Sequence, residues 1–128
     1  MVKKEIQKLM SCFPGSFINH NFEVILLPKT NLYFLLNNVK TVEDLQFKVI
    51  AWCSRDASKT QPYYSDWRNK EYQTRVRNSI NEFLGTDFNA DQWMDIYTEF
   101  GNACHEDRCR EFIRSGFDLK ILSNKGEN

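Results

Sequence analysis

Hydrophobic positions along the chain follow a helical pattern first and a strand-like pattern next. Residues 2–11 place Ile6, Leu9 and Met10 at helical spacing, and the turn-forming sequence FPGS follows them. Residues 16–37 contain the runs SFINH, NFEVILLP and NLYFLLNN, which are rich in β-branched and aromatic residues and are separated by Asn and by Pro-Lys-Thr-Asn. This part of the chain predicts a meander of three short antiparallel strands.

After Lys40 the pattern becomes helical again. Thr41 has the properties of an N-cap, and Glu43 and Asp44 follow it in the first turn, where carboxylates suit the positive end of a helix dipole. The apolar side of this predicted helix consists of Leu45, Val49, Ile50, Trp52 and Cys53. Residues 54–66 are polar and include a proline, so we expect a loop there that is open to contact with partners.

Three further helices are expected in the second half of the chain. The first covers residues 66–84 and ends at Gly85, and the second begins at the capping-box sequence NADQ, residues 89–92, and ends at Gly101. The last covers residues 102–115. Its successor, FDLKIL, is expected to add a final strand. The fold class is therefore predicted to be α+β, with a small antiparallel β-meander near the N-terminus packed on four to five helices.

The composition predicts one globular domain, residues 1–128, with a flexible tail at 123–128. Hydrophobic residues make up 41% of the chain and ten of its residues are Phe, which is enough to form a core. The N-terminus lacks the apolar run of a secretory signal, and no segment approaches the length of a membrane span. We therefore expect a cytoplasmic protein without membrane contacts, whose four cysteines are reduced and mostly buried.

Charge is segregated along the chain although the seventeen basic and seventeen acidic residues cancel. Residues 54–77 contain six basic residues against three acidic ones. From Asn78 to Asp107 there is no Lys or Arg. The seven acidic residues of this stretch are Glu82, Asp87, Asp91, Asp95, Glu99, Glu106 and Asp107.

Asp91, Asp95 and Glu99 lie four positions apart, so a helix would arrange them as a column in which each neighbouring pair repels by a few tenths of a kcal/mol. In one interpretation these acids pair with arginines of the preceding helix or keep a solvated face soluble. In the other, the column binds a basic surface on another macromolecule. The predicted partner-binding residues are Asp87, Asp91, Asp95, Glu99, Glu106 and Asp107.

Candidate catalytic groups are sparse. His105 and Cys109 could share a helical face as metal ligands, but two ligands do not make a zinc site and no Cys-x-x-Cys pair completes it. The phosphate-binding motifs G-x-x-x-x-G-K-[ST] and G-x-G-x-x-G do not occur. We therefore expect a protein that is not an enzyme and that needs no metal or other cofactor.

Nucleic-acid binding is the alternative function. It would use the basic side of the helix predicted at 66–84, where aromatic rings beside basic groups suit stacking on single strands. The residues of this alternative site are Arg68, Lys70, Arg75, Arg77, Tyr64 and Trp67. A helix-turn-helix around Gly101 is a weaker form of it, because the acidic helix would lie against phosphates.

Three segments resemble a known class of proteins: YFLLNNVKTVEDLQFKVIAWCSR, FLGTDF and GNACHEDRCREFIRSGFDL. They are similar to small accessory proteins of phages and prophages of low-GC Gram-positive bacteria. Anti-CRISPR proteins, which bind a host nuclease such as Cas9 and are often acidic, belong to this group. The resemblance implies a host-cytosol inhibitor of a CRISPR-Cas nuclease. Because this chain is neutral overall, only one face would imitate nucleic acid, or the inhibitor would block nuclease motion or promote dimerisation.

Overall fold

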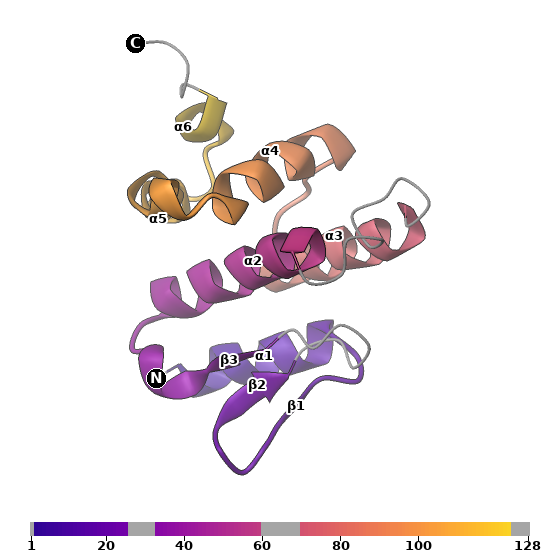
Figure 1. The fold of residues 1–128 in the computed structure, drawn as a ribbon, viewed down its shortest axis with the longest axis vertical. Coiled ribbons are helices and arrows are strands. Elements are labelled where there is room, and N and C mark those ends of the chain that lie inside the picture. The colour runs from indigo at the N-terminus through magenta and orange to yellow at the C-terminus, as the bar shows by residue number, and fades with distance from the viewer. Residues whose placement is uncertain (1, 26–32, 60–69, 124–128) are drawn as a thin grey trace.

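The computed structural model describes residues 2–25, 33–59 and 70–123, and this part of the chain is mostly helical with one small sheet (Figure 1). It therefore has the predicted α+β character, although its six α-helices exceed the four or five expected. The α-helices are α1 (Lys3–Cys12), α2 (Val42–Lys59), α3 (Lys70–Leu84), α4 (Ala90–Gly101), α5 (Glu106–Arg114) and α6 (Leu119–Ser123). The remaining elements are β1 (Phe17–Ile18), β2 (Glu23–Ile25), β3 (Tyr33–Leu35) and the 3₁₀ helices η1 (Leu36–Asn38) and η4 (Ala103–His105).

The predicted meander is confirmed as a three-stranded antiparallel sheet in the order β1-β2-β3. In its register Ile18 lies opposite Val24, and Val24 lies opposite Phe34. The side chain of Val24 is fully buried, so one face of the sheet packs on the core. The opposite face carries Phe17 and Leu35, both of which are exposed.

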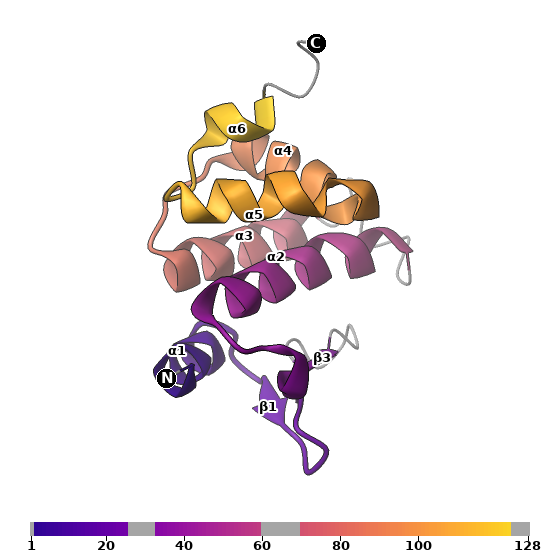
Figure 2. The same ribbon diagram turned by 90° about the vertical axis from the view of Figure 1, so that its left-hand side faces the viewer.

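The elements stack in three tiers (Figures 1 and 2). Helix α1 and the sheet form one end of the molecule, α2 and α3 lie in the middle, and α4, α5 and α6 form the other end. A single cluster of buried side chains runs through all three tiers, from Leu9 and Val24 through Ile50 and Ile80 to Phe112. Helix α2 contacts both α4 and α5, so it packs against the two helices that contain most of the acidic residues between 78 and 107.

The start of α2 follows the prediction, but its end does not. The Thr41 hydroxyl accepts the backbone N–H of Asp44 at 3.0 Å, and the Asp44 carboxylate accepts the N–H of Thr41 at 3.2 Å. The loop expected at 54–66 is wrong for residues 54–59, which belong to α2. Ser54 is accommodated because its hydroxyl donates to the Ile50 carbonyl, and no Gly or Pro interrupts the helix before Pro62. The rest of that loop lies outside the described residues.

The helices on either side of the acidic stretch also keep their predicted signals. Helix α3 begins at Lys70 in the described residues, so the predicted start at 66 lies outside them. Gly85 ends it with φ of 73°, which only glycine adopts easily. Asn89 and Gln92 form the predicted capping box at the start of α4.

The C-terminal part differs from the prediction. The single helix expected at 102–115 is divided into η4 and α5, because the Asn102 side chain accepts the N–H of Cys104 and starts a tighter turn. The final strand expected in FDLKIL is wrong: α6 forms there, with the Asp118 side chain accepting the N–H of Lys120 at its start. Of the predicted tail, Ser123 belongs to α6 and residues 124–128 lie outside the described part.

All four cysteines are free thiols, and Cys12, Cys53 and Cys109 are buried, which confirms the expectation of mostly buried cysteines. Among the described helices, none combines the length and the apolar character that crossing a bilayer requires.

Candidate interaction surface

The linker between α3 and α4 is held in place by one asparagine. The Asn81 side chain accepts the N–H of Phe88 at 2.8 Å and donates to the Phe88 carbonyl at 3.0 Å. The same side chain accepts the Thr86 hydroxyl at 2.9 Å, while Phe88 is buried. Asp87 lies between Thr86 and Phe88, both of which Asn81 binds, and it is exposed. Its carboxylate therefore faces solvent from a segment whose position is fixed by hydrogen bonds.

Helix α4 has two distinct faces. Its inner face buries Trp93, Ile96 and Phe100 in the core. Its outer side presents the exposed residues Asp91 and Asp95, and the side chain of Met94, next to Asp95 in sequence, is 53% exposed. We call Asp87, Asp91, Met94 and Asp95 the α4 acidic surface.

The three carboxylates of the α4 acidic surface have no ion-pair partner among the described residues. In the preceding helix, Arg75 lies 4.0 Å from Glu71 of its own helix, and no pair joins Arg77 to α4 in the described part. The interpretation that arginines of the preceding helix neutralise these acids is therefore not supported for Arg75 or Arg77. Arg68, the third arginine considered, lies outside the described residues.

Glu99 does not belong to this surface, so the prediction that it continues the exposed column is wrong. Its side chain is only 1% exposed. One carboxylate oxygen lies 2.5 Å from Nδ1 of His105, and the other accepts Arg108 at 3.2 Å. A buried carboxylate with these two partners joins the end of α4 to η4 and α5, which is a structural role.

Glu99 differs from Asp91 and Asp95 because of the rotation per residue in an α-helix. Four residues turn an α-helix by about 400°, so each step of the column is rotated by about 40° and two steps by about 80°. Asp91 and Asp95 stay on the outer face, whereas Glu99 is rotated toward the side where the chain folds back. Once a helix covers that side, a carboxylate must be paired there or be absent.

Glu106 and Asp107 also have local roles. Both lie in the first turn of α5, where negative charge is favoured by the helix dipole. The Glu106 carboxylate accepts Nε of Arg110 at 2.9 Å, while Asp107 is exposed. Their predicted part in partner binding is untested, and Asp107 is the freer of the two to contact a partner.

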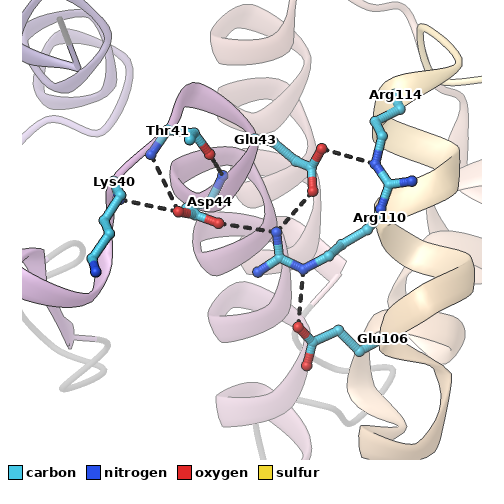
Figure 3. A network of polar contacts seen from close by, with 7 residues as sticks. All are labelled: Lys40, Thr41, Glu43, Asp44, Glu106, Arg110 and Arg114. Atoms are coloured by element: carbon cyan, nitrogen blue, oxygen red, sulfur yellow. Dashed lines mark hydrogen bonds and ion pairs between the residues drawn. The ribbon is translucent and has the colours of Figure 1, made fainter.

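Sequence reasoning missed the largest group of charges in the described residues (Figure 3). Arg110 Nη1 donates to Glu43 at 2.8 Å and to Asp44 at 3.0 Å, while its Nε donates to Glu106. Arg114 donates to the second oxygen of Glu43 at 2.9 Å. We call these five residues the Arg110 cluster, and they link the start of α2 to α5. The sequence signals were two i, i+4 spacings on one helix, Glu106 with Arg110 and Arg110 with Arg114. Neither identifies partners as distant in sequence as Glu43 and Asp44.

The guanidinium of Arg110 also lies 4.7 Å from the centre of the Phe47 ring, in a cation–π contact. Burial by itself would lower the pKa of Arg110, but its hydrogen bonds to Glu43, Glu106 and Asp44 outweigh burial and raise it. Hydrogen bonding by Arg110 lowers the pKa of Glu43, and the backbone N–H of Lys40, ahead of Arg110, lowers the pKa of Asp44. The lowered pKa values favour the charged forms of the Glu43 and Asp44 carboxylates.

The metal site considered for His105 and Cys109 receives no support from the geometry. Nδ1 of His105 faces Glu99, and burial raises the pKa of the Cys109 thiol to about 12. In the described ranges, no group of three or more His, Cys, Asp or Glu side chains is arranged to hold a metal ion.

The alternative nucleic-acid site is only partly described. Tyr64, Trp67 and Arg68 lie outside the described residues. Lys70 is the first residue of α3, and Arg75 is largely exposed. Arg77 is half-buried. Because half of the set lies outside the described residues, the alternative site stays a prediction.

Comparisons of this chain with models of protein families, with curated proteins and with solved structures found no match.

Proposed function

We propose that this protein is a non-enzymatic interaction protein that binds and inhibits a host protein through the α4 acidic surface. The observation that carries the proposal is the exposure of Asp87, Asp91 and Asp95 without an ion-pair partner in the described residues. Other acids of the same stretch, Glu99 and Glu106, are used within the fold. The contrast separates carboxylates with an internal role from carboxylates that remain available to a partner.

Met94 adds an exposed apolar side chain to this surface. Large hydrophobic residues on a protein surface are ordinary when they are isolated, but here the exposed Met94 lies on the same helix as the two exposed carboxylates, next to Asp95 in sequence. Protein interfaces commonly place an apolar anchor inside a polar rim, and methionine is enriched in them. The charges would guide the encounter with a cationic surface, and burial of Met94 would slow dissociation.

The partner that fits this surface is a protein groove lined by Lys and Arg. Asp91 and Asp95 are about 6 Å apart along the helix axis, so they repeat negative charge along one line, as the phosphates of one nucleic-acid strand do. The resemblance to phage accessory proteins points to a CRISPR-Cas nuclease of the Cas9 type. In such a nuclease a positively charged channel contacts the sugar-phosphate backbone of the guide–target duplex. With Glu99 absent from the surface, the contact is smaller than the full column that the sequence predicted.

A matched pair of charge reversals tests the proposal. The double variant Asp91→Lys with Asp95→Lys should lose a host protein that the wild-type chain retains in a pull-down from host lysate. Glu111→Lys, an exposed acid on α5, is the control and should retain it. Equal retention by all three proteins, with unchanged circular-dichroism melts, would exclude the α4 acidic surface as the contact.

The narrower identity of the partner needs a purified nuclease. A Cas9–guide complex should cleave its target more slowly in the presence of the wild-type chain and at full rate with the double variant. If cleavage is unaffected while the pull-down still shows charge-dependent capture, the partner is a different basic protein.

The nucleic-acid alternative is tested by a gel shift with single- and double-stranded DNA. Binding through Arg75 and its basic neighbours predicts a shift that weakens steeply with salt and is lost in Arg75→Glu. Absence of any shift up to high micromolar protein would remove this alternative.

A further inference from the structure

The carboxylates of the α4 acidic surface come from two kinds of segment. Asp91 and Asp95 lie on α4, whose helical geometry fixes their spacing. Asp87 lies in the linker between α3 and α4, where the backbone forms neither helix nor strand. The linker begins at Gly85, beside which an added Cβ would meet no atom within 4 Å. The position of Asp87 relative to Asp91 therefore depends on other contacts of the linker.

One carboxamide holds the linker on both sides of Asp87. Asn81 Oδ1 accepts the Phe88 N–H at 2.8 Å and the Thr86 hydroxyl at 2.9 Å, and Nδ2 donates to the Phe88 carbonyl at 3.0 Å. The backbone carbonyl of Asn81 also accepts the N–H groups of Gly85 and Thr86. The Phe88 N–H belongs to the peptide unit that follows Asp87, so its bond to Asn81 fixes that peptide plane. The buried Phe88 ring anchors the same residue through its side chain.

Asparagine is specific for this contact. Its carboxamide carries both an acceptor and a donor, so it can pair with the N–H and the C=O of a single residue. A carboxylate would place an oxygen against the Phe88 carbonyl, and alanine would leave both backbone groups of Phe88 without this partner. In a helix interior, asparagine is less favourable than alanine. The presence of Asn81 near the end of α3 is therefore explained by the linker that it binds, since the helix itself would favour another residue.

We infer that Asn81 is a positioning residue for partner binding, because it holds Asp87 in place before the partner arrives. The inference rests on the proposed function of the α4 acidic surface. A cationic groove that binds Asp87 together with Asp91 and Asp95 would otherwise have to order the linker, and ordering a backbone costs conformational entropy. With the linker ordered in the free protein, that entropy is lost on folding. Asn81 does not touch the partner and acts only through Asp87.

Hydrogen exchange of the Phe88 amide tests the restraint without a partner. In Asn81→Ala this amide loses its acceptor, so it should exchange at least about ten-fold faster than in the wild-type chain. The amide of Ile96, in the middle of α4, is the internal reference and should change less. Circular-dichroism melts verify that the variant is folded. Thr86→Val removes only the hydroxyl bond to Asn81 and replaces Asn81→Ala if that variant does not fold.

A double-variant cycle with Asp87 tests the positioning role. Binding is read as slowing of the Cas9–guide complex or, where cleavage is unaffected, with the host protein captured in the pull-down. Asn81→Ala and Asp87→Asn should each weaken binding about five-fold, and the double variant should bind no more weakly than the weaker single variant. Asn102→Ala is the matched control, because it removes an asparagine that binds a backbone N–H at the opposite end of α4. It should leave binding unchanged.

Two outcomes overturn the positioning role alone, provided that Asp91→Lys with Asp95→Lys still loses the partner. One is wild-type binding by Asn81→Ala, and the other is a double variant whose two losses multiply, which would show that Asn81 acts on the whole fold. A Phe88 amide that exchanges equally slowly in the wild-type chain and in Asn81→Ala also overturns it. If the wild-type chain captures no partner, or the double reversal binds as the wild type does, the proposed function fails and the positioning role with it.

Discussion

The Arg110 cluster and the α4 acidic surface contain the same kind of side chain in opposite situations. In the cluster, the carboxylates of Glu43, Asp44 and Glu106 converge on one guanidinium from two helices that are distant in sequence. On α4, Asp91 and Asp95 repeat along one helix, and no cation of the described residues meets them. The first arrangement stabilises the fold, whereas the second contributes little to it.

Glu99 lies at the boundary between these two situations. It is part of the same acidic run as Asp95, yet it is buried and bound by Arg108 and His105. The comparison teaches that a carboxylate has a structural role when tertiary packing brings a cation to it. Spacing along a helix does not reveal which carboxylates these are.

Replacing Glu99 should have the largest effect of any single acid. Glu99→Ala leaves Arg108 and His105 without their buried partner, and we expect a loss of about 3 kcal/mol in the free energy of unfolding. Urea denaturation followed by circular dichroism measures it. Asp95→Ala, four residues away and exposed, should change the same quantity by less than about 0.5 kcal/mol. Equal effects of the two variants would show that Glu99 contributes no more to folding stability than the exposed Asp95.

Arg110→Ala should have the next largest effect, a loss of about 2 kcal/mol in the free energy of unfolding. Three carboxylates lose a shared cation that is only partly exposed. Arg75→Ala is the control: its pair with Glu71 is long and exposed, so the free energy of unfolding should change by less than about 0.5 kcal/mol. If both arginines prove equally dispensable, the Arg110 cluster does not stabilise the fold.

Acid should weaken the Arg110 cluster in a definite direction. The pKa values of Glu43 and Asp44 are lowered from their ordinary values of 4.5 and 3.8. A lowered folded-state pKa gives stability that is complete above the ordinary value and is lost as the pH falls through the folded-state value. Thermal melts should therefore show stability falling from about pH 5 downward. The fall should be smaller in Arg110→Ala, and a steeper fall in that variant would contradict the assignment.

Reversing one charge on the α4 acidic surface should have the smallest effect on folding and a large effect on binding. Asp95→Lys converts a repulsive i, i+4 pair with Asp91 into an attractive one, and we expect a gain of about 0.3 kcal/mol in the free energy of unfolding. Chemical denaturation checks the sign. A clear destabilisation would mean that Asp95 has an internal role, and the proposed docking surface would lose its basis.

Much of the local structure could be predicted from the sequence. Four features depend on residues close together in the chain, so the sequence predicts them: the N-cap at Thr41, the capping box at Asn89, the helix end at Gly85 and the meander. The predicted strand at FDLKIL failed for a related reason: a short apolar run does not distinguish a strand from a helix, and the Asp118 cap decided it.

The candidate surface could be predicted only in part. The sequence by itself determined that positive charge is absent from residues 78–107 and that Asp91 and Asp95 share one side of a helix. Only the tertiary structure decided that Glu99 is turned inward and that Arg110 draws together Glu43, Asp44 and Glu106. The physical reason is that periodicity fixes the direction of a side chain relative to its own helix, whereas burial and pairing depend on which other helix packs against that side.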